Sequence, residues 1–227
     1  MKLRQSFVLA YGLALIPLCV PVTAIAQISE LRVGIAEFDE NTLDLPFVND
    51  FAGDENSVAI TGEVLFEEPE FLKWALSPQP YIGGTLNLEG DTSFAGGGLL
   101  WRQTVGKKFY GDFALGLVVH DGTTTIEPSD EFVALLNQAN GFETIDDIPE
   151  DLLNALISEN NQFIDRFDSE IEFGSRVLFR LQGAIGYNFN EDWAGEVYIE
   201  HLSNGGVFSD ERNDGVNILG LRAARKF

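Results

Sequence analysis

Hydrophobic and polar residues alternate along most of this chain with the period of two that β-strands produce. In segment 58–67, for example, Ile60 and Val64 share one face while Thr61 and Glu63 share the other. Turn signals such as Gly90-Asp91 separate segments of this kind. The pattern predicts an all-β fold of eight antiparallel strands, at 30–38, 58–67, 81–89, 92–105, 109–121, 175–189, 193–204 and 215–227.

The polar face of these strands carries charges of both signs, although the formal net charge of the chain is −22. A closed interior would pair such charges, and the opposite face suits hydrocarbon. Only a closed barrel satisfies the backbone groups of strands in a membrane. The charges therefore favour an eight-stranded up-and-down outer-membrane barrel over a soluble lipocalin-like barrel or a narrow channel. The residues expected inside are Arg32, Arg176, Arg180, Arg222, Glu63, Glu89, Asp112, Glu196 and Glu200.

The two ends of the chain predict export to the envelope of a Gram-negative bacterium. Residues 1–26 combine two basic residues, an apolar run and the string Ala24-Ile25-Ala26, which is typical of a cleaved signal peptide. We expect residues 27–227 to form a single barrel domain in the outer membrane. The terminal Phe227 ends an amphipathic strand, a pattern that resembles the signal recognised by the outer-membrane assembly machinery.

The acidic charge excludes a protein that binds the phosphate backbone of nucleic acids. Thirteen acids and one base, Arg166, lie in segment 122–174, where helices are predicted at 131–139 and near 149–163. We predict a partly helical extracellular insertion, acting either as a solvated cap or as a lid near an active site. No metal site is predicted, because the chain has two histidines, and its one cysteine lies in the expected signal peptide.

Three hydrogen-bonding side chains share the apolar face of the last two predicted strands. His201 and Ser203 are in phase with Val197, and Asn217 is in phase with Leu219 on the adjoining strand. Polar groups that face lipid are costly unless they are paired or functional. A serine near a histidine is the pair needed for acyl transfer, in which the imidazole accepts the hydroxyl proton and the alkoxide attacks an ester carbonyl. The alternative is that these residues are only interfacial polar groups at a strand end.

The string His201-Leu202-Ser203-Asn204-Gly205-Gly206, followed by Asn213-Asp214-Gly215-Val216-Asn217 and a terminal strand, resembles the lipid A 3-O-deacylase (PagL) family. Its members are eight-stranded outer-membrane barrels with a His/Ser/Glu triad on the lipid-facing wall. The resemblance implies Ser203 as nucleophile, His201 as base, and Asn204 with the Gly206 amide as oxyanion donors. It implies hydrolysis of the ester-linked 3-O acyl chain of lipid A, in lipopolysaccharide of the outer leaflet, without a cofactor.

Asn217 stands where the family has a glutamate. An asparagine oxygen can accept the imidazole N–H, as in Cys-His-Asn proteases, but it is neutral and stabilises the imidazolium less. A non-catalytic barrel with a structural or surface-interaction role is therefore the alternative function. The expected acyl-groove residues are Phe179, Leu181 and Val197, on the lipid-facing side of the sixth and seventh strands. The sequence leaves open whether the protein is a monomer or a homodimer.

Overall fold

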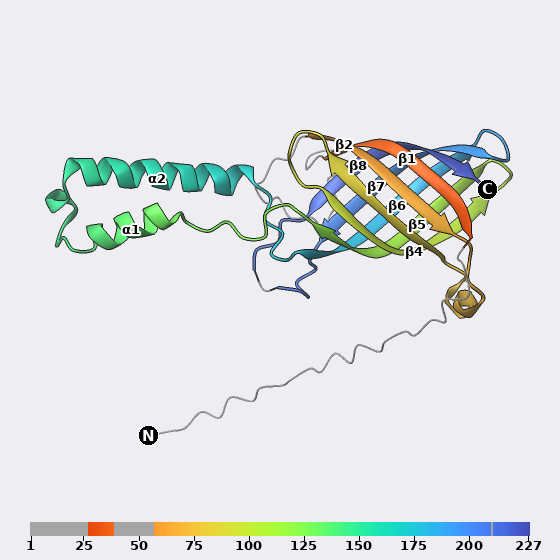
Figure 1. The fold of residues 1–227 in the computed structure, drawn as a ribbon, viewed down its shortest axis with the longest axis horizontal. Coiled ribbons are helices and arrows are strands. Elements are labelled where there is room, and N and C mark those ends of the chain that lie inside the picture. The colour runs from red at the N-terminus through yellow and green to blue at the C-terminus, as the bar shows by residue number, and fades with distance from the viewer. Residues whose placement is uncertain (1–26, 39–56, 210) are drawn as a thin grey trace, which may run out of the picture.

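The computed structural model of the chain describes residues 27–38, 57–209 and 211–227. Eight antiparallel strands form a closed barrel in which each strand pairs with its neighbours in the chain and β8 closes on β1 (Figure 1). The predicted eight-stranded outer-membrane barrel is thus confirmed. The predicted signal peptide lies outside the described residues. The strands are β1 (Ile28–Phe38), β2 (Ser57–Phe66), β3 (Gln79–Asn87), β4 (Phe94–Val105), β5 (Phe109–His120), β6 (Val177–Asn188), β7 (Trp193–Ser203) and β8 (Val216–Lys226).

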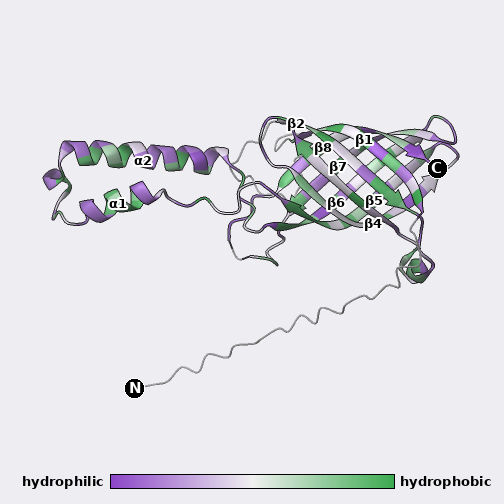
Figure 2. Ribbon diagram, viewed as in Figure 1, coloured by the Kyte–Doolittle hydropathy of each residue, from purple (hydrophilic) through white to green (hydrophobic). Residues whose placement is uncertain are grey.

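The outer wall of the barrel is apolar. Apolar and polar residues alternate along the strands (Figure 2), and the exposed positions of β1 and β5 include Val33, Ile35, Leu115 and Leu117. Because successive side chains point to opposite sides of a strand, the buried positions between them face the barrel interior. In the described part of the chain, no helix is both long enough and apolar enough to span a membrane.

The interior is held together by charged pairs. The buried carboxylate of Glu63 accepts hydrogen bonds from Arg180 Nη2 at 2.7 Å and Arg222 Nη1 at 2.8 Å. Arg32 Nη1 lies 3.4 Å from the same carboxylate, and Arg32 Nη2 donates to Asp112 at 2.5 Å. Burying charges stabilises a structure only when they are paired and hydrogen-bonded, and this network meets that condition.

Two residues predicted for this interior lie outside it. Glu89 and Arg176 are exposed, and Arg176 donates to the backbone oxygen of Gly122. The prediction was wrong because β3 ends at Asn87 and β6 begins at Val177, so alternation no longer places these side chains. Glu30 and Arg102, which the sequence pattern did not single out, join the network instead through a hydrogen bond of 2.7 Å.

The connection between β5 and β6 contains the two predicted helices, α1 (Asp130–Ala139) and α2 (Glu150–Ser169). They form a hairpin that extends from the end of the barrel opposite the C-terminus (Figure 1). The Ser129 side chain caps α1 by accepting a hydrogen bond from the backbone N–H of Phe132. Helix α2 is longer than predicted, and Arg166 and Glu170 form an ion pair of 3.0 Å at its last turn.

Candidate active site

The strand register brings the predicted site residues to one corner of the outer wall. His201 of β7 pairs directly with Asn217 of β8, while Leu181 and Phe179 of β6 pair with His201 and Ser203. The sequence pattern predicted this juxtaposition from the phase of the two strands. The corner lies at the end of the barrel from which the α1–α2 hairpin extends (Figure 1).

The imidazole of His201 is oriented by Asn217. His201 Nδ1 lies 2.9 Å from Asn217 Oδ1, and Asn217 is only 3% exposed. Because an amide oxygen can only accept, this contact requires the proton on Nδ1 and leaves the Nε2 lone pair free. Gly215 makes room for the ring, since a Cβ at that position would lie 3.1 Å from His201 Cε1. His201 therefore has the tautomer that a base acting through Nε2 needs.

The hydroxyl oxygen of Ser203 accepts two hydrogen bonds. Asn213 Nδ2 donates to it at 2.9 Å and the backbone N–H of Gly205 donates at 3.0 Å. Among the described contacts, no hydrogen bond joins Ser203 to His201. Two residues of one strand that share a face are about 7 Å apart along it, so the side chains have to turn toward each other. Catalytic hydrogen bonds are often long in a resting site and tighten when substrate binds.

Asn204 and Gly206, the oxyanion donors that the family resemblance implies, bond to each other. The Gly206 N–H donates to Asn204 Oδ1 at 2.6 Å, and Asn204 Nδ2 donates to the Phe173 backbone oxygen at 2.9 Å. Asn204 is fully buried. The donors that adjoin Ser203 Oγ are instead Asn213 Nδ2 and the Gly205 N–H.

Asn213 received no role from the sequence, although it belongs to the string that carries the family resemblance. It lies in the β7–β8 connection, where strand phase gives no information on side-chain direction. Its Oδ1 also accepts the backbone N–H of Asn204 at 3.1 Å. The only feature of the sequence that could have pointed to Asn213 was therefore its place in the string Asn213-Asp214-Gly215-Val216-Asn217.

Residues 171–174, which we call the stem, join α2 to β6 and are fastened to the β7–β8 connection. The Glu172 and Asp214 backbones are linked by a hydrogen bond of 2.9 Å, and Asp214 Oδ2 accepts the Glu172 N–H at 2.9 Å. Arg212 Nε donates to Asp214 Oδ1 at 2.7 Å. Burial raises the pKa of the Glu172 carboxyl above its usual value. The stem thus belongs to the same hydrogen-bond network as Asn213 and Asn204.

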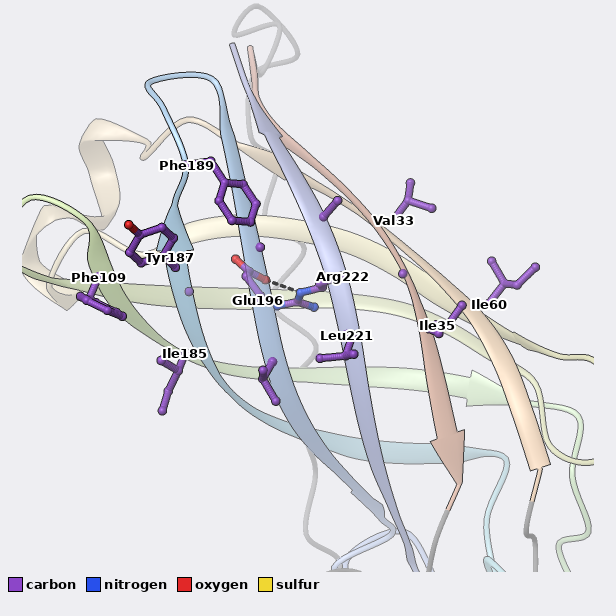
Figure 3. Close-up of a pocket in the computed structure, with 15 residues that line it drawn as sticks. Val33, Ile35, Ile60, Phe109, Ile185, Tyr187, Phe189, Glu196, Leu221 and Arg222 are labelled. Atoms are coloured by element: carbon purple, nitrogen blue, oxygen red, sulfur yellow. Dashed lines mark hydrogen bonds and ion pairs between the residues drawn. The ribbon is translucent and has the colours of Figure 1, made fainter.

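The predicted groove residues divide into two groups. Val197 lines an apolar depression of about 770 Å³ on the outer wall. Figure 3 shows this depression, with Ile185 and Leu221 among its labelled residues. A second depression of about 420 Å³ includes Gly183 and shares Ile185 and Val197 with the first. Phe179 and Leu181 line neither of these two depressions.

Phe179 and Leu181 instead border the catalytic candidates. Leu181 pairs with His201, and Phe179 pairs with Ser203 and stacks on Phe208 with ring centroids 4.9 Å apart. On the same face, the next pair after Leu181 and His201 is Gly183 with Ile199, which lies closer to the barrel end that carries the C-terminus. An apolar surface therefore leads from Ser203 toward the two depressions.

A comparison with protein families finds a match to part of the chain. The family model "Lipid A 3-O-deacylase (PagL)" matches residues 155–226, which include β6, β7 and β8. No curated protein matches the chain.

A comparison with solved structures gives three matches that each have 10% sequence identity to this chain. The crystal structure of the outer membrane enzyme PagL has a TM-score of 0.49, over 88% of this chain and 100% of that one. A de novo designed transmembrane β-barrel has a TM-score of 0.42, over 89% and 97%. The Yersinia pestis outer membrane protein Ail has a TM-score of 0.39, over 88% and 99%. The resemblance to the lipid A 3-O-deacylase (PagL) family that the sequence predicts is thus confirmed, by a family match over the segment that carries the site.

Proposed function

We propose that this protein is an outer-membrane esterase that removes the 3-O acyl chain of lipid A, with Ser203 as nucleophile and His201 as base. The observation that carries the proposal is the hydrogen bond of 2.9 Å between His201 Nδ1 and Asn217 Oδ1 on the lipid-facing wall. This bond fixes the imidazole as an acceptor through Nε2, on the same strand face as a serine that already has two hydrogen-bond donors at its oxygen.

The reaction begins when the Ser203 hydroxyl turns to donate its proton to His201 Nε2. The Ser203 oxygen attacks the ester carbonyl of the acyl chain, and a tetrahedral oxyanion forms. Collapse breaks the ester bond, and the imidazolium returns its proton to the sugar oxygen that leaves. His201 then deprotonates a water molecule, which attacks the acyl-enzyme carbonyl. The bond between the acyl group and Ser203 Oγ breaks, the imidazolium returns its proton to Ser203 Oγ, and the fatty acid is released. This route requires no cofactor.

The oxyanion needs N–H donors that are in place before it forms. Asn213 Nδ2 and the Gly205 N–H already point at Ser203 Oγ and have to move little to reach an oxygen bound to the attacked carbon. The Gly206 N–H would contribute only after its bond to Asn204 Oδ1 opens, and Asn204 Nδ2 would have to turn from the Phe173 backbone oxygen. We therefore assign the first role to Asn213 and Gly205, with Asn204 and Gly206 as further donors.

The substrate would reach the site from the outer leaflet. Lipid A places its acyl chains in hydrocarbon, and the apolar surface formed by Phe179 and Leu181 leads to the depression at Val197. Export by a signal peptide and recognition of Phe227 by the outer-membrane assembly machinery belong to the same proposal.

A non-catalytic barrel is the second candidate function. It is favoured by the neutral Asn217 in place of a carboxylate and by the lack of a Ser203–His201 bond among the described contacts. In that case the polar side chains at this corner would only form hydrogen bonds with one another and would have no catalytic role.

The experiment that separates the two is mass spectrometry of lipid A from Gram-negative cells that express the protein. We expect the wild type to remove one hydroxyacyl mass, and Ser203→Ala to leave lipid A intact. Ser158→Ala, a change in α2 far from the site, is the matched control and should behave as the wild type. Unchanged lipid A with a barrel that is inserted in the membrane would favour the non-catalytic role, and deacylation by Ser203→Ala would refute the nucleophile.

A further inference from the structure

The connection between β2 and β3 presents an apolar surface that the barrel does not bury. It contains a short 3₁₀ helix, η1 (Glu70–Ala75), in which no residue is buried. Phe71, Trp74 and Leu76 are 58%, 82% and 85% exposed. The connections from β4 to β5 and from β6 to β7, at the same end of the barrel, are only short turns, as is usual on the inner side of such barrels. This longer connection therefore has a surface that needs an explanation.

The helix η1 is amphipathic. A 3₁₀ helix has three residues per turn, so residues three apart lie along one edge. Phe71 and Trp74 share one edge, and Glu70 and Lys73 share another, where they form an ion pair of 2.6 Å. One side of the helix is thus suited to hydrocarbon and another to water.

The apolar side is held in a defined position. Trp101 Nε1 of β4 donates to the Ala75 backbone oxygen at 2.8 Å, which fastens the helix to the barrel wall. Leu76 and Ser77 have φ angles of 66° and 51°, in the left-handed region that residues with a side chain rarely adopt. A conformation of this kind persists only where surrounding contacts enforce it.

The helix continues a belt of aromatic residues. The chain has three tryptophans, Trp74, Trp101 and Trp193, and the last two lie on strands close to the turns at the same end. In Figure 1 the short helix, coloured gold, lies next to the end of the barrel that carries the C-terminus. Tryptophan is enriched where a membrane meets water, and outer-membrane barrels carry aromatic girdles at both interfaces.

We propose that η1 docks onto the inner, phospholipid leaflet of the membrane around the barrel, with Phe71, Trp74 and Leu76 inserted at the interface. The Glu70–Lys73 ion pair faces water. This inference rests on the proposed outer-membrane location and is independent of the deacylase chemistry. By fixing one end of the barrel at the inner interface, the helix sets the depth at which His201 and Ser203 meet the outer leaflet.

Tryptophan fluorescence tests this in the full chain. Trp193→Phe retains Trp74 and Trp101, and the double change Trp74→Phe/Trp193→Phe retains Trp101 alone. Subtracting the two spectra isolates the Trp74 signal while Trp101 keeps its hydrogen bond to η1. The probe is a vesicle of phosphatidylethanolamine and phosphatidylglycerol, with or without bromine on the phospholipid acyl chains.

We expect the Trp74 emission to be blue-shifted, to lose at least half of its intensity with brominated lipid and to resist quenching by acrylamide. Phe71→Ser/Leu76→Ser in the same background should reverse all three. Emission that is red-shifted, insensitive to bromine and quenched by acrylamide would overturn the proposal. Protection from acrylamide without quenching by bromine would also overturn it, because a second protein surface would then cover the helix.

Discussion

Exchanging Asn217 for aspartate tests whether the contact with His201 has a catalytic role. The two side chains have the same shape, so an aspartate oxygen can keep the contact of 2.9 Å with His201 Nδ1. The difference is charge, which matters when the imidazole becomes an imidazolium in the transition state. We expect Asn217→Asp to raise kcat/KM for deacylation.

The magnitude follows from the contact that already exists. A neutral hydrogen bond contributes about 0.5–1.5 kcal/mol and one to a charged group about 1.5–3 kcal/mol, so the gain is about 1–1.5 kcal/mol. At 1.36 kcal/mol per factor of ten, kcat/KM should rise about 5- to 13-fold. The factor of about 10⁴ associated with losing a triad carboxylate does not apply, because that loss includes the wrong tautomer. Asn217 Oδ1 already selects the right one.

The assay is release of fatty acid from purified lipid A by the full-length protein in detergent micelles. Asn217→Ala removes the acceptor and should lower kcat/KM, and Asn217→Asp/Ser203→Ala should be inactive. If the aspartate and the alanine variants both match the wild type, then the side chain of residue 217 does not orient the base, and the reasoning fails.

Three further predictions concern the barrel and the stem. Glu63→Leu leaves three interior arginines without their shared carboxylate and should lower the free energy of unfolding in micelles by about 3–5 kcal/mol; a loss below about 1 kcal/mol would contradict this. Gly220→Ala places a Cβ 2.3 Å from the Tyr198 ring. This overpacking should lower the free energy of unfolding by about 1–3 kcal/mol and thereby lower the thermal midpoint. Gly62→Ala, where a Cβ has room, should leave the midpoint unchanged. The pKa of Glu172 is raised in the folded protein, so the unfolded chain loses this proton at a lower pH than the folded one. The free energy of unfolding therefore falls as the pH rises from the ordinary pKa of a glutamate through the raised pKa. Glu172→Gln should raise the thermal midpoint at pH 7 and leave it unchanged at pH 4.

Strand phase accounts for the part of the site that the sequence predicts. His201 and Asn217 lie on strands whose alternation is regular up to those residues, and the register pairs them directly. The same alternation predicted all eight strands, because each is bounded by a turn that the sequence marks. Where alternation stops, it no longer predicts the direction of a side chain. Glu89 and Arg176 were assigned to the interior from strands that end before reaching them.

The contacts that the sequence could not predict are made by residues in the irregular connections between strands. Asn213 reaches Ser203 from within an irregular connection, and Asn204 bonds to the backbone of Phe173, thirty-one residues earlier. No periodic pattern or residue spacing in the sequence indicates either contact. They depend on how two connections at one end of the barrel meet, which only the three-dimensional structure shows.

The stem explains how a wall that faces lipid can hold a serine and a histidine. Polar groups in hydrocarbon are costly unless each has a partner, and here His201 pairs with Asn217, Ser203 with Asn213, and Asn204 with the stem at Phe173. The last of these partners comes from the insertion between β5 and β6, so the insertion contributes to the site through its stem. The helices beyond the stem pack against each other, as in the contact between the rings of Phe132 and Phe163. Helix α2 also contacts the β7–β8 connection, because the Arg212 guanidinium lies 4.1 Å from the centre of the Phe167 ring. The insertion therefore meets the candidate site through its stem and through the last turn of α2.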